Sequence, residues 1–208
     1  LRPDVARKNP ALYLSFAAFC VFSVAVQVFF PYLIIYIQNY LKIDGYAVVL
    51  GVVLITASVV SVVLGKVIDR VGKLRFVLPA AGVMLAGLVG MFFVRGMLGV
   101  IIAGCVMMSG YMLVTAALSG VIRDSTPRDK VGHFQGIRMI FGVLLPMIIG
   151  PAIGAAVIRG SDSTYVELGV VKTVPTPGIF LAAAVVLVMI IPFVQALKKH
   201  AEKEADAK

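Results

Sequence analysis

The chain of 208 residues is too apolar for a water-soluble domain, because 61% of its residues are hydrophobic and only 14% are charged. A soluble domain of this size has about half apolar and about a quarter charged residues. The mean hydropathy is +1.03, and apolar stretches recur to the end of the chain, which excludes a signal peptide as their explanation. A net charge of +9 would suggest nucleic-acid binding in a soluble protein. In a membrane protein, basic residues mark the cytoplasmic ends of helices, so we expect a lipid bilayer and no nucleic acid as partner.

The apolar stretches predict an all-α polytopic membrane protein with six transmembrane helices. Each stretch is long enough for the roughly 20 residues with which a helix crosses the hydrocarbon core. The first is longer than a bilayer requires, so we expect Pro31 to kink it and the turns after Tyr36 to emerge into the interface. A linker at residues 1–10 and a charged tail at residues 198–208 flank the expected spans, which are residues 11–41, 46–68, 74–94, 98–122, 132–158 and 178–197.

The basic residues give the predicted spans an orientation. The 19 Lys and Arg residues gather on one side of the predicted spans, except for Lys42, Arg95, Arg159 and Lys172. This asymmetry predicts that both termini are cytoplasmic, which an even number of spans also requires. The outer loops are short apart from residues 159–177, where a β-hairpin is possible.

The two cysteines, Cys20 and Cys105, lie inside predicted spans and have no His or second Cys nearby. We therefore expect neither a disulfide framework nor a metal site, and the sequence indicates no cofactor.

A charged segment follows the second predicted span. Residues 65–73 read Gly-Lys-Val-Ile-Asp-Arg-Val-Gly-Lys. The segment resembles the pattern G-x-x-x-D-[RK]-x-G-[RK] of the major facilitator superfamily, which lies on the cytoplasmic side between the second and third helices of a half. Leu74 stands where a further basic residue is usual, although Arg75 follows at once. The resemblance implies a conformational role for Gly65, Asp69, Arg70, Gly72 and Lys73.

A second segment, residues 123–136, resembles the family's R-D-x-x-P-x-x-x-G-x-x-x-G loop between the fourth and fifth helices. Arg138 follows it, and we expect this side chain to extend to the cytoplasmic surface rather than to pair with another half. The fifth span carries a Gly-Pro-rich stretch that is similar to the family's fifth helix. The residues concerned are Arg123, Asp124, Pro127, Gly132, Gly136 and Arg138 in the gating motif and Gly150, Pro151 and Gly154 in helix packing.

The resemblance implies that this chain is one six-helix half of a larger transporter. Residues 1–10 read like the linker that enters a second half, and residues 31–36 are similar to the opening helix of second halves in bacterial members. We therefore favour the C-terminal half over the N-terminal half. The expected location is the bacterial inner (plasma) membrane, and the expected partner is the other half or a second copy in a homodimer.

Asp69 is the central residue of the first motif. The resemblance implies that its carboxylate meets a helix N-terminus of the opposite half and latches the cytoplasmic side shut, which the helix dipole favours. Arg70 and Arg123 are near enough in topology to pair with Asp69 or Asp124. The plainer alternative is a basic loop with a helix cap.

Uncharged polar side chains in the first and fourth spans are candidates for contact with a solute. Gln27 and Gln38 share one stripe of the first span, and Tyr111, Thr115 and Ser119 recur every four residues in the fourth. Hydrogen bonding between helices is an equally good explanation for each of them. The candidate substrate cavity comprises Gln27, Tyr32, Tyr36, Gln38, Tyr111, Thr115 and Ser119.

The predicted spans hold no Asp or Glu at mid-membrane depth, where a coupled carrier usually needs one. A coupling ion would therefore use the other half, and facilitative transport is the alternative. An enzyme is not expected, because the spans contain no carboxylate pair and no Ser–His arrangement. The leading hypothesis is half of a symporter, antiporter or facilitative transporter for a small solute. The alternative is an isolated membrane module without transport of its own.

Overall fold

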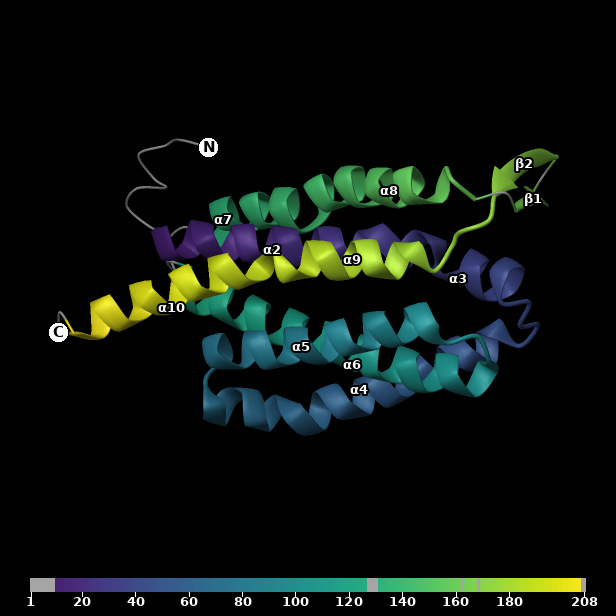
Figure 1. Ribbon diagram of the computed structural model, residues 1–208. Coiled ribbons are helices and arrows are strands. Elements are labelled where there is room, and N and C mark those ends of the chain that lie inside the picture. The colour runs from purple at the N-terminus through teal and green to yellow at the C-terminus, as the bar shows by residue number, and fades with distance from the viewer. Residues whose placement is uncertain (1–9, 127–130, 162, 168, 207–208) are drawn as a thin grey trace.

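The computed structural model describes residues 10–126, 131–161, 163–167 and 169–206 as a bundle of long helices (Figure 1). In this part of the chain, six helical stretches are long and apolar enough to cross a membrane, which confirms the predicted fold class. They run from Pro10 to Tyr40, Tyr46 to Val71, Lys73 to Phe93, Met97 to Ser125, Phe134 to Ile158 and Gly178 to Lys203. Hydropathy predicts these spans because an apolar segment in lipid must hydrogen-bond its own backbone groups, and a helix does this within one segment.

The helices and strands have the following bounds. The first span consists of α2 (Pro10–Phe29), a 3-10 turn (Phe30–Tyr32), α3 (Leu33–Ile35) and a π-helical turn (Tyr36–Tyr40). Then come α4 (Tyr46–Val71), α5 (Lys73–Phe93), α6 (Met97–Ser125), α7 (Val131–Met139), a π-helical turn (Ile140–Leu144) and α8 (Leu145–Ile158). The outer loop forms β1 (Thr164–Glu167) and β2 (Val170–Thr173), and the last span is α9 (Gly178–Val188) with α10 (Ile190–Asp206).

Local sequence explains where the first span changes its winding. The 3-10 turn contains Pro31, whose ring nitrogen has no hydrogen to donate to the preceding turn. The chain continues as helix beyond it, so the first and longest span is interrupted rather than ended. Between the second and third spans, Gly72 alone connects α4 with α5. Its φ is 97°, a backbone conformation that residues with a Cβ rarely adopt.

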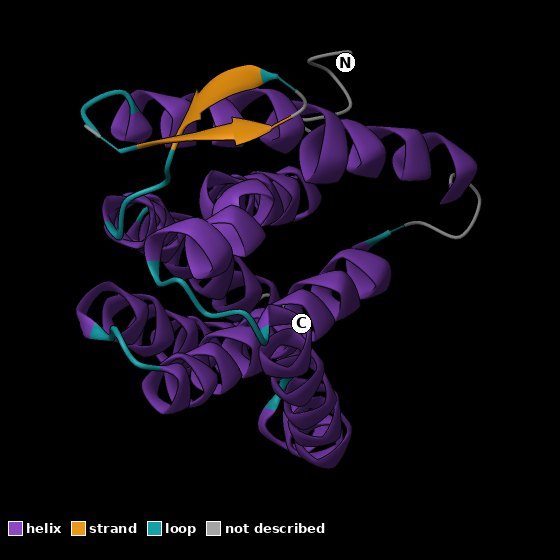
Figure 2. Cartoon of the chain, turned by 90° about the vertical axis from the view of Figure 1, so that its right-hand side faces the viewer, coloured by secondary structure: helices purple, strands orange, loops and turns teal. Residues whose placement is uncertain are grey.

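The first residue of α2 and the last of α10 lie at the same end of the bundle, as an even number of spans requires (Figure 1). We call this the cytoplasmic end, because the basic residues gather there. The antiparallel β1–β2 hairpin lies at the opposite, outer end, which Figure 2 faces. Beyond Leu197, the charged tail continues α10 as helix to Asp206.

The helix contacts follow an internal pattern. The first span, α2, packs against α8 and against α9 and α10, while the fourth span, α6, packs against α4 and α5. In addition, α2 contacts α6, and α5 contacts α9 and α10. Exchanging spans one, two and three with four, five and six reproduces this pattern, as expected for a half built from two three-helix repeats.

The spans differ in how far the bundle buries them. In the first and fourth spans, 50% of the residues in the most apolar window are buried, against 17% in the second and fifth. The third and sixth spans lie between, at 39%. The second span (α4) and the fifth (α7 and α8) therefore present the faces that this bundle leaves uncovered, and Figure 1 places them at opposite edges.

Glycines bring α5 and α6 into backbone contact. A Cβ on Gly110 of α6 would lie 2.3 Å from the Met84 backbone nitrogen of α5, and a Cβ on Gly87 would lie 2.3 Å from that of Met107. No side chain fits there. The two glycines, which have no side chain, therefore set how closely α5 and α6 approach each other at mid-length.

Candidate functional site at the cytoplasmic end

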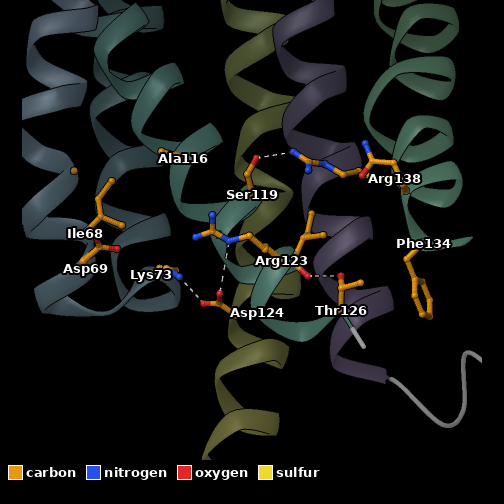
Figure 3. A pocket seen from close by; sticks show the side chains of 14 residues that line it. Ile68, Asp69, Lys73, Ala116, Ser119, Arg123, Asp124, Thr126, Phe134 and Arg138 are labelled. Atoms are coloured by element: carbon orange, nitrogen blue, oxygen red, sulfur yellow. Dashed lines mark hydrogen bonds and ion pairs between the residues drawn. The ribbon is translucent and has the colours of Figure 1, made fainter. Parts of the chain in front are cut away.

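The sequence motifs meet around a cavity of about 950 Å³ at the cytoplasmic end. Four helices form it: the last turns of α4, the start of α5, the last turns of α6, and α7. Figure 3 shows the side chains of these elements converging on one space. The cavity is lined by Gly65, Ile68, Asp69, Lys73, Ala116, Ser119, Gly120, Ile122, Arg123, Asp124, Thr126, Phe134, Gln135 and Arg138.

An ion pair joins the two motif loops. Lys73 Nζ lies 2.5 Å from a carboxylate oxygen of Asp124, and Arg123 Nε lies 4.0 Å from the other. Lys73 is the first residue of α5 and Asp124 lies in the last turn of α6, so each charge sits at the end of its helix where the dipole disfavours it. Pairing offsets both effects and ties α5 to α6.

Lys73 reaches Asp124 because Gly120 leaves room for it. A Cβ on Gly120 would lie 2.7 Å from Lys73 Cδ, so the lysine stem crosses α6 over this glycine. The expected partner of Asp124 was an arginine, and the closer partner is Lys73. Sequence reasoning missed this contact. The only sequence signal for it is a small residue one helical turn before Asp124.

Asp69 lies exposed in the last turns of α4 and lines the same cavity. Within the described residues it has no ion pair, and its neighbour Arg70 is exposed as well. A carboxylate near a helix C-terminus gains nothing from its own helix dipole. Asp69 is thus available to a positive partner outside this bundle.

Arg138 does not simply extend into water. Its Nη2 donates a hydrogen bond to Ser119 Oγ at 3.0 Å, and its guanidinium carbon lies 5.7 Å from the centre of the Phe19 ring. The side chain is half-buried between α7, α6 and α2. The sequence predicted that this side chain extends to the cytoplasmic surface; in the structure it lines the cavity at that end, where a hydroxyl and an aromatic ring hold the guanidinium against the bundle.

The remaining motif residues differ in how closely they are surrounded. Gly65, Gly132 and Gly136 have open space where a Cβ would stand, so this bundle places no atom against them. Their faces belong to the uncovered second and fifth spans. Pro127 lies outside the described residues.

The candidate cavity residues do not form one site. Ser119 lines the cytoplasmic cavity, whereas Gln38 is exposed near the outer end. Tyr36 is fully buried and contacts the rings of Tyr40 and Phe180. It lies in the core, although the sequence suggested a solute-facing position.

Two further candidates lie in the middle of the fourth span. Tyr111 stacks on Phe22 with ring centres 5.8 Å apart. Thr115 donates its hydroxyl hydrogen to the Tyr111 carbonyl one turn earlier, at 2.8 Å. These contacts connect α6 with α2 and within α6 itself, so they stabilise the bundle whether or not a solute touches them.

The Gly-Pro-rich stretch brings α8 against α2. A Cβ on Gly150 would lie 2.4 Å from Gln27 Cβ, and one on Gly154 would lie 2.4 Å from the Tyr32 ring. The Tyr32 hydroxyl donates to the Pro151 carbonyl at 3.0 Å. Gln27 and Tyr32 therefore face α8, and this contact mirrors the one that α6 makes with α4.

Fold and site together define a polytopic helical membrane protein with charged motifs between its second and third and its fourth and fifth spans. The sequence model of the Major Facilitator Superfamily matches residues 3–151, well over half of the chain. The chain belongs to this superfamily of membrane transporters. Neither the curated proteins nor the solved structures with which it was compared gave a match.

Proposed function

We propose that this chain is one half of a transporter that moves a small solute across the bacterial plasma membrane by alternating access. The observation that carries the proposal is the position of the cavity. It opens between α4 and α7, the same two spans that the bundle leaves uncovered. A second bundle that covers these spans would close the cavity into a passage along the membrane normal.

The second bundle is the other six-helix half of the same transporter. A second copy of this half, paired as a homodimer, is the alternative. In either arrangement Asp69 meets the N-terminus of the partner's fifth helix when the cytoplasmic side is closed. Its exposure and the absence of an ion pair within the described residues support this role.

The transport could be coupled, as in a symporter or antiporter, or facilitative. No described residue of this half at mid-membrane depth is a carboxylate. An ion-coupling carboxylate would therefore come from the partner half. The second candidate function, a helical membrane module without transport, differs from the first in a single measurable property, which is solute flux.

Flux is tested with the native full-length protein in proteoliposomes and a panel of labelled sugars, amino acids and organic anions, with and without an ionophore. We expect accumulation of at least one solute class above empty liposomes. Asp69→Asn should slow that flux, whereas the matched outer-end variant Asp44→Asn should leave it unchanged. Flux that equals empty liposomes for the whole panel would favour the module without transport.

A further inference from the structure

Arg138 is a cation whose partners in this bundle carry no charge. Of its guanidinium nitrogens, Nη2 donates to the Ser119 hydroxyl, and the central carbon of the group lies 5.7 Å from the centre of the Phe19 ring. In the described residues, no carboxylate oxygen lies within 4.0 Å of it. A guanidinium has five N–H donors in a planar fork, so most of its donors remain available to a ligand.

The other charges of the cavity do not neutralise it. Among the described residues that line the cavity, Lys73 and Arg123 share one carboxylate, that of Asp124. Asp69 stands on a different wall, at the end of α4. Figure 3 shows Arg138 and Ser119 set apart from the Lys73–Asp124–Arg123 group, at another level of the cavity. Near the loops, the two cations Lys73 and Arg123 balance the two carboxylates Asp69 and Asp124, so Arg138 is the charge of the cavity lining that has no counterion among the described residues.

Arg138 lies deep enough in the bundle that its charge costs free energy unless a partner or a ligand compensates it. It is seven residues into α7, which places it about 10 Å along the helix from its first residue at 1.5 Å per residue. A cation inside a membrane protein is kept where it meets a partner or a ligand. A small solute fits, since ligand pockets commonly enclose about 300–1,000 Å³ and this cavity has about 950 Å³.

We propose that Arg138 binds the anionic group of the transported solute, a carboxylate or phosphate, at the cytoplasmic end of the passage. This proposal rests on the proposed transport function and names its substrate class. Ser119 holds the guanidinium through Nη2 and the Phe19 ring lies beside it, so the remaining N–H groups form a pre-arranged fork. A fork of this kind binds two oxygens of one oxyanion, which an ammonium cannot do in the same way.

Two other sources could supply an oxyanion to Arg138. One is the headgroup of an anionic lipid that enters the cavity, and the other is a carboxylate of the partner bundle. Both share the chemistry of the solute but differ in whether the anion dissolves in water. The experiment separates them through the lipid and through competition by a soluble anion.

The test uses the native full-length protein in nanodiscs and measures succinate and inorganic phosphate binding by calorimetry. The nanodiscs contain phosphatidylcholine alone or phosphatidylcholine with phosphatidylglycerol. We expect saturable binding of at least one of the two anions with the same affinity in both lipids. Arg138→Gln should weaken it by about tenfold or more, and Arg138→Lys by less, because the charge stays but the fork is lost.

Arg75→Gln is the matched control, because it removes one arginine from the same end of the protein at an exposed position outside this cavity. It should leave binding unchanged. Weaker anion binding in phosphatidylglycerol would assign the position to a lipid headgroup. No binding by the native protein, or equal binding by Arg138→Gln, would overturn the proposal and leave pairing with the partner bundle as the role of Arg138.

The outcome is separable from that of the transport function. Flux of neutral solutes alone, with no effect of Arg138→Gln on their transport, would leave the transporter standing and remove the anion site. Anion binding that depends on Arg138, without flux of any solute, would keep the site and remove the transport function.

Discussion

The helix α6 meets α5 in two regions that use a glycine in opposite ways. In the middle, Gly110 lies against the backbone of Met84, which cannot move aside. Near the cytoplasmic end, Gly120 lies against the stem of Lys73, a flexible side chain that can. The comparison teaches that the bundle is rigid at its centre and adjustable at the end that carries the motifs. The proposed alternating-access function would use this division, because a half that moves as one body needs a rigid centre and gate contacts that can form and break.

The largest effect is expected at the rigid contact. Gly110→Ala places a methyl group 2.3 Å from the Met84 backbone nitrogen, so α5 and α6 must separate. We expect a loss of about 3 kcal/mol in the free energy of unfolding, the upper part of the usual cost of overpacking. Thermal unfolding in detergent, followed by size-exclusion chromatography, measures it. A variant as stable as the native protein would show that the helices do not cross at this glycine.

The next effect concerns the ion pair at the adjustable contact. Exchanging the charges, with Lys73→Asp and Asp124→Lys together, keeps the pair and puts each charge at the helix end that its dipole favours. Each single variant should be less stable than the native protein. The double variant should be at least as stable as the native protein, and therefore more stable than the sum of the two single effects predicts. The Asp124 side chain is 55% exposed, so we expect a coupling energy of only about 0.5–1 kcal/mol. Additive single variants would mean that the two groups do not interact in solution.

A smaller change in the free energy of unfolding, of opposite sign, is expected for a glycine on the exposed face of α5. A Cβ on Gly82 meets nothing within 4 Å, and this glycine is in the middle of the helix. Gly82→Ala should stabilise the protein by about 0.5–1 kcal/mol, because alanine loses less backbone entropy than glycine in a helix. It also serves as the matched control for Gly110→Ala. A clear loss of stability would indicate that another bundle packs on this face.

The smallest effect is expected for Gly120→Ala. The added methyl displaces the Lys73 stem, but the better helix propensity of alanine offsets that cost. The unfolding free energy should change by less than about 0.5 kcal/mol. Loosening of the Lys73–Asp124 pair should appear instead as faster chemical labelling of the Lys73 amine. A loss as large as that of Gly110→Ala would show that the cytoplasmic end is as rigid as the centre.

The candidate site could be predicted only in part from the sequence. The two motif segments were found because their residue types follow a fixed spacing along the chain, and the structure places both on one cavity. The partner of Asp124 and the surroundings of Arg138 could not be found in this way. Lys73 and Ser119 are 51 and 19 residues away from these groups in the sequence, and only the helix crossings bring them near.

The burial of Tyr36 also could not be predicted from the sequence. Its position on the first span suggested a face toward a solute, because polar groups in a membrane are usually functional. In the fold, the π-helical turn and Phe180 of α9 enclose it in the core. A helical stripe read from sequence says which residues share a face. It does not say which neighbour covers that face.

The sequence by itself determined the helical spans, their number and the end of the bundle at which the basic residues gather. These properties are local, since a bilayer selects apolar stretches of fixed length and the charges between them set the orientation. Only the tertiary structure decided which glycines meet a backbone, which lysine pairs with Asp124 and which surface holds Arg138. Such contacts depend on how helices from distant parts of the chain cross, and small residues permit many crossings until close packing selects one.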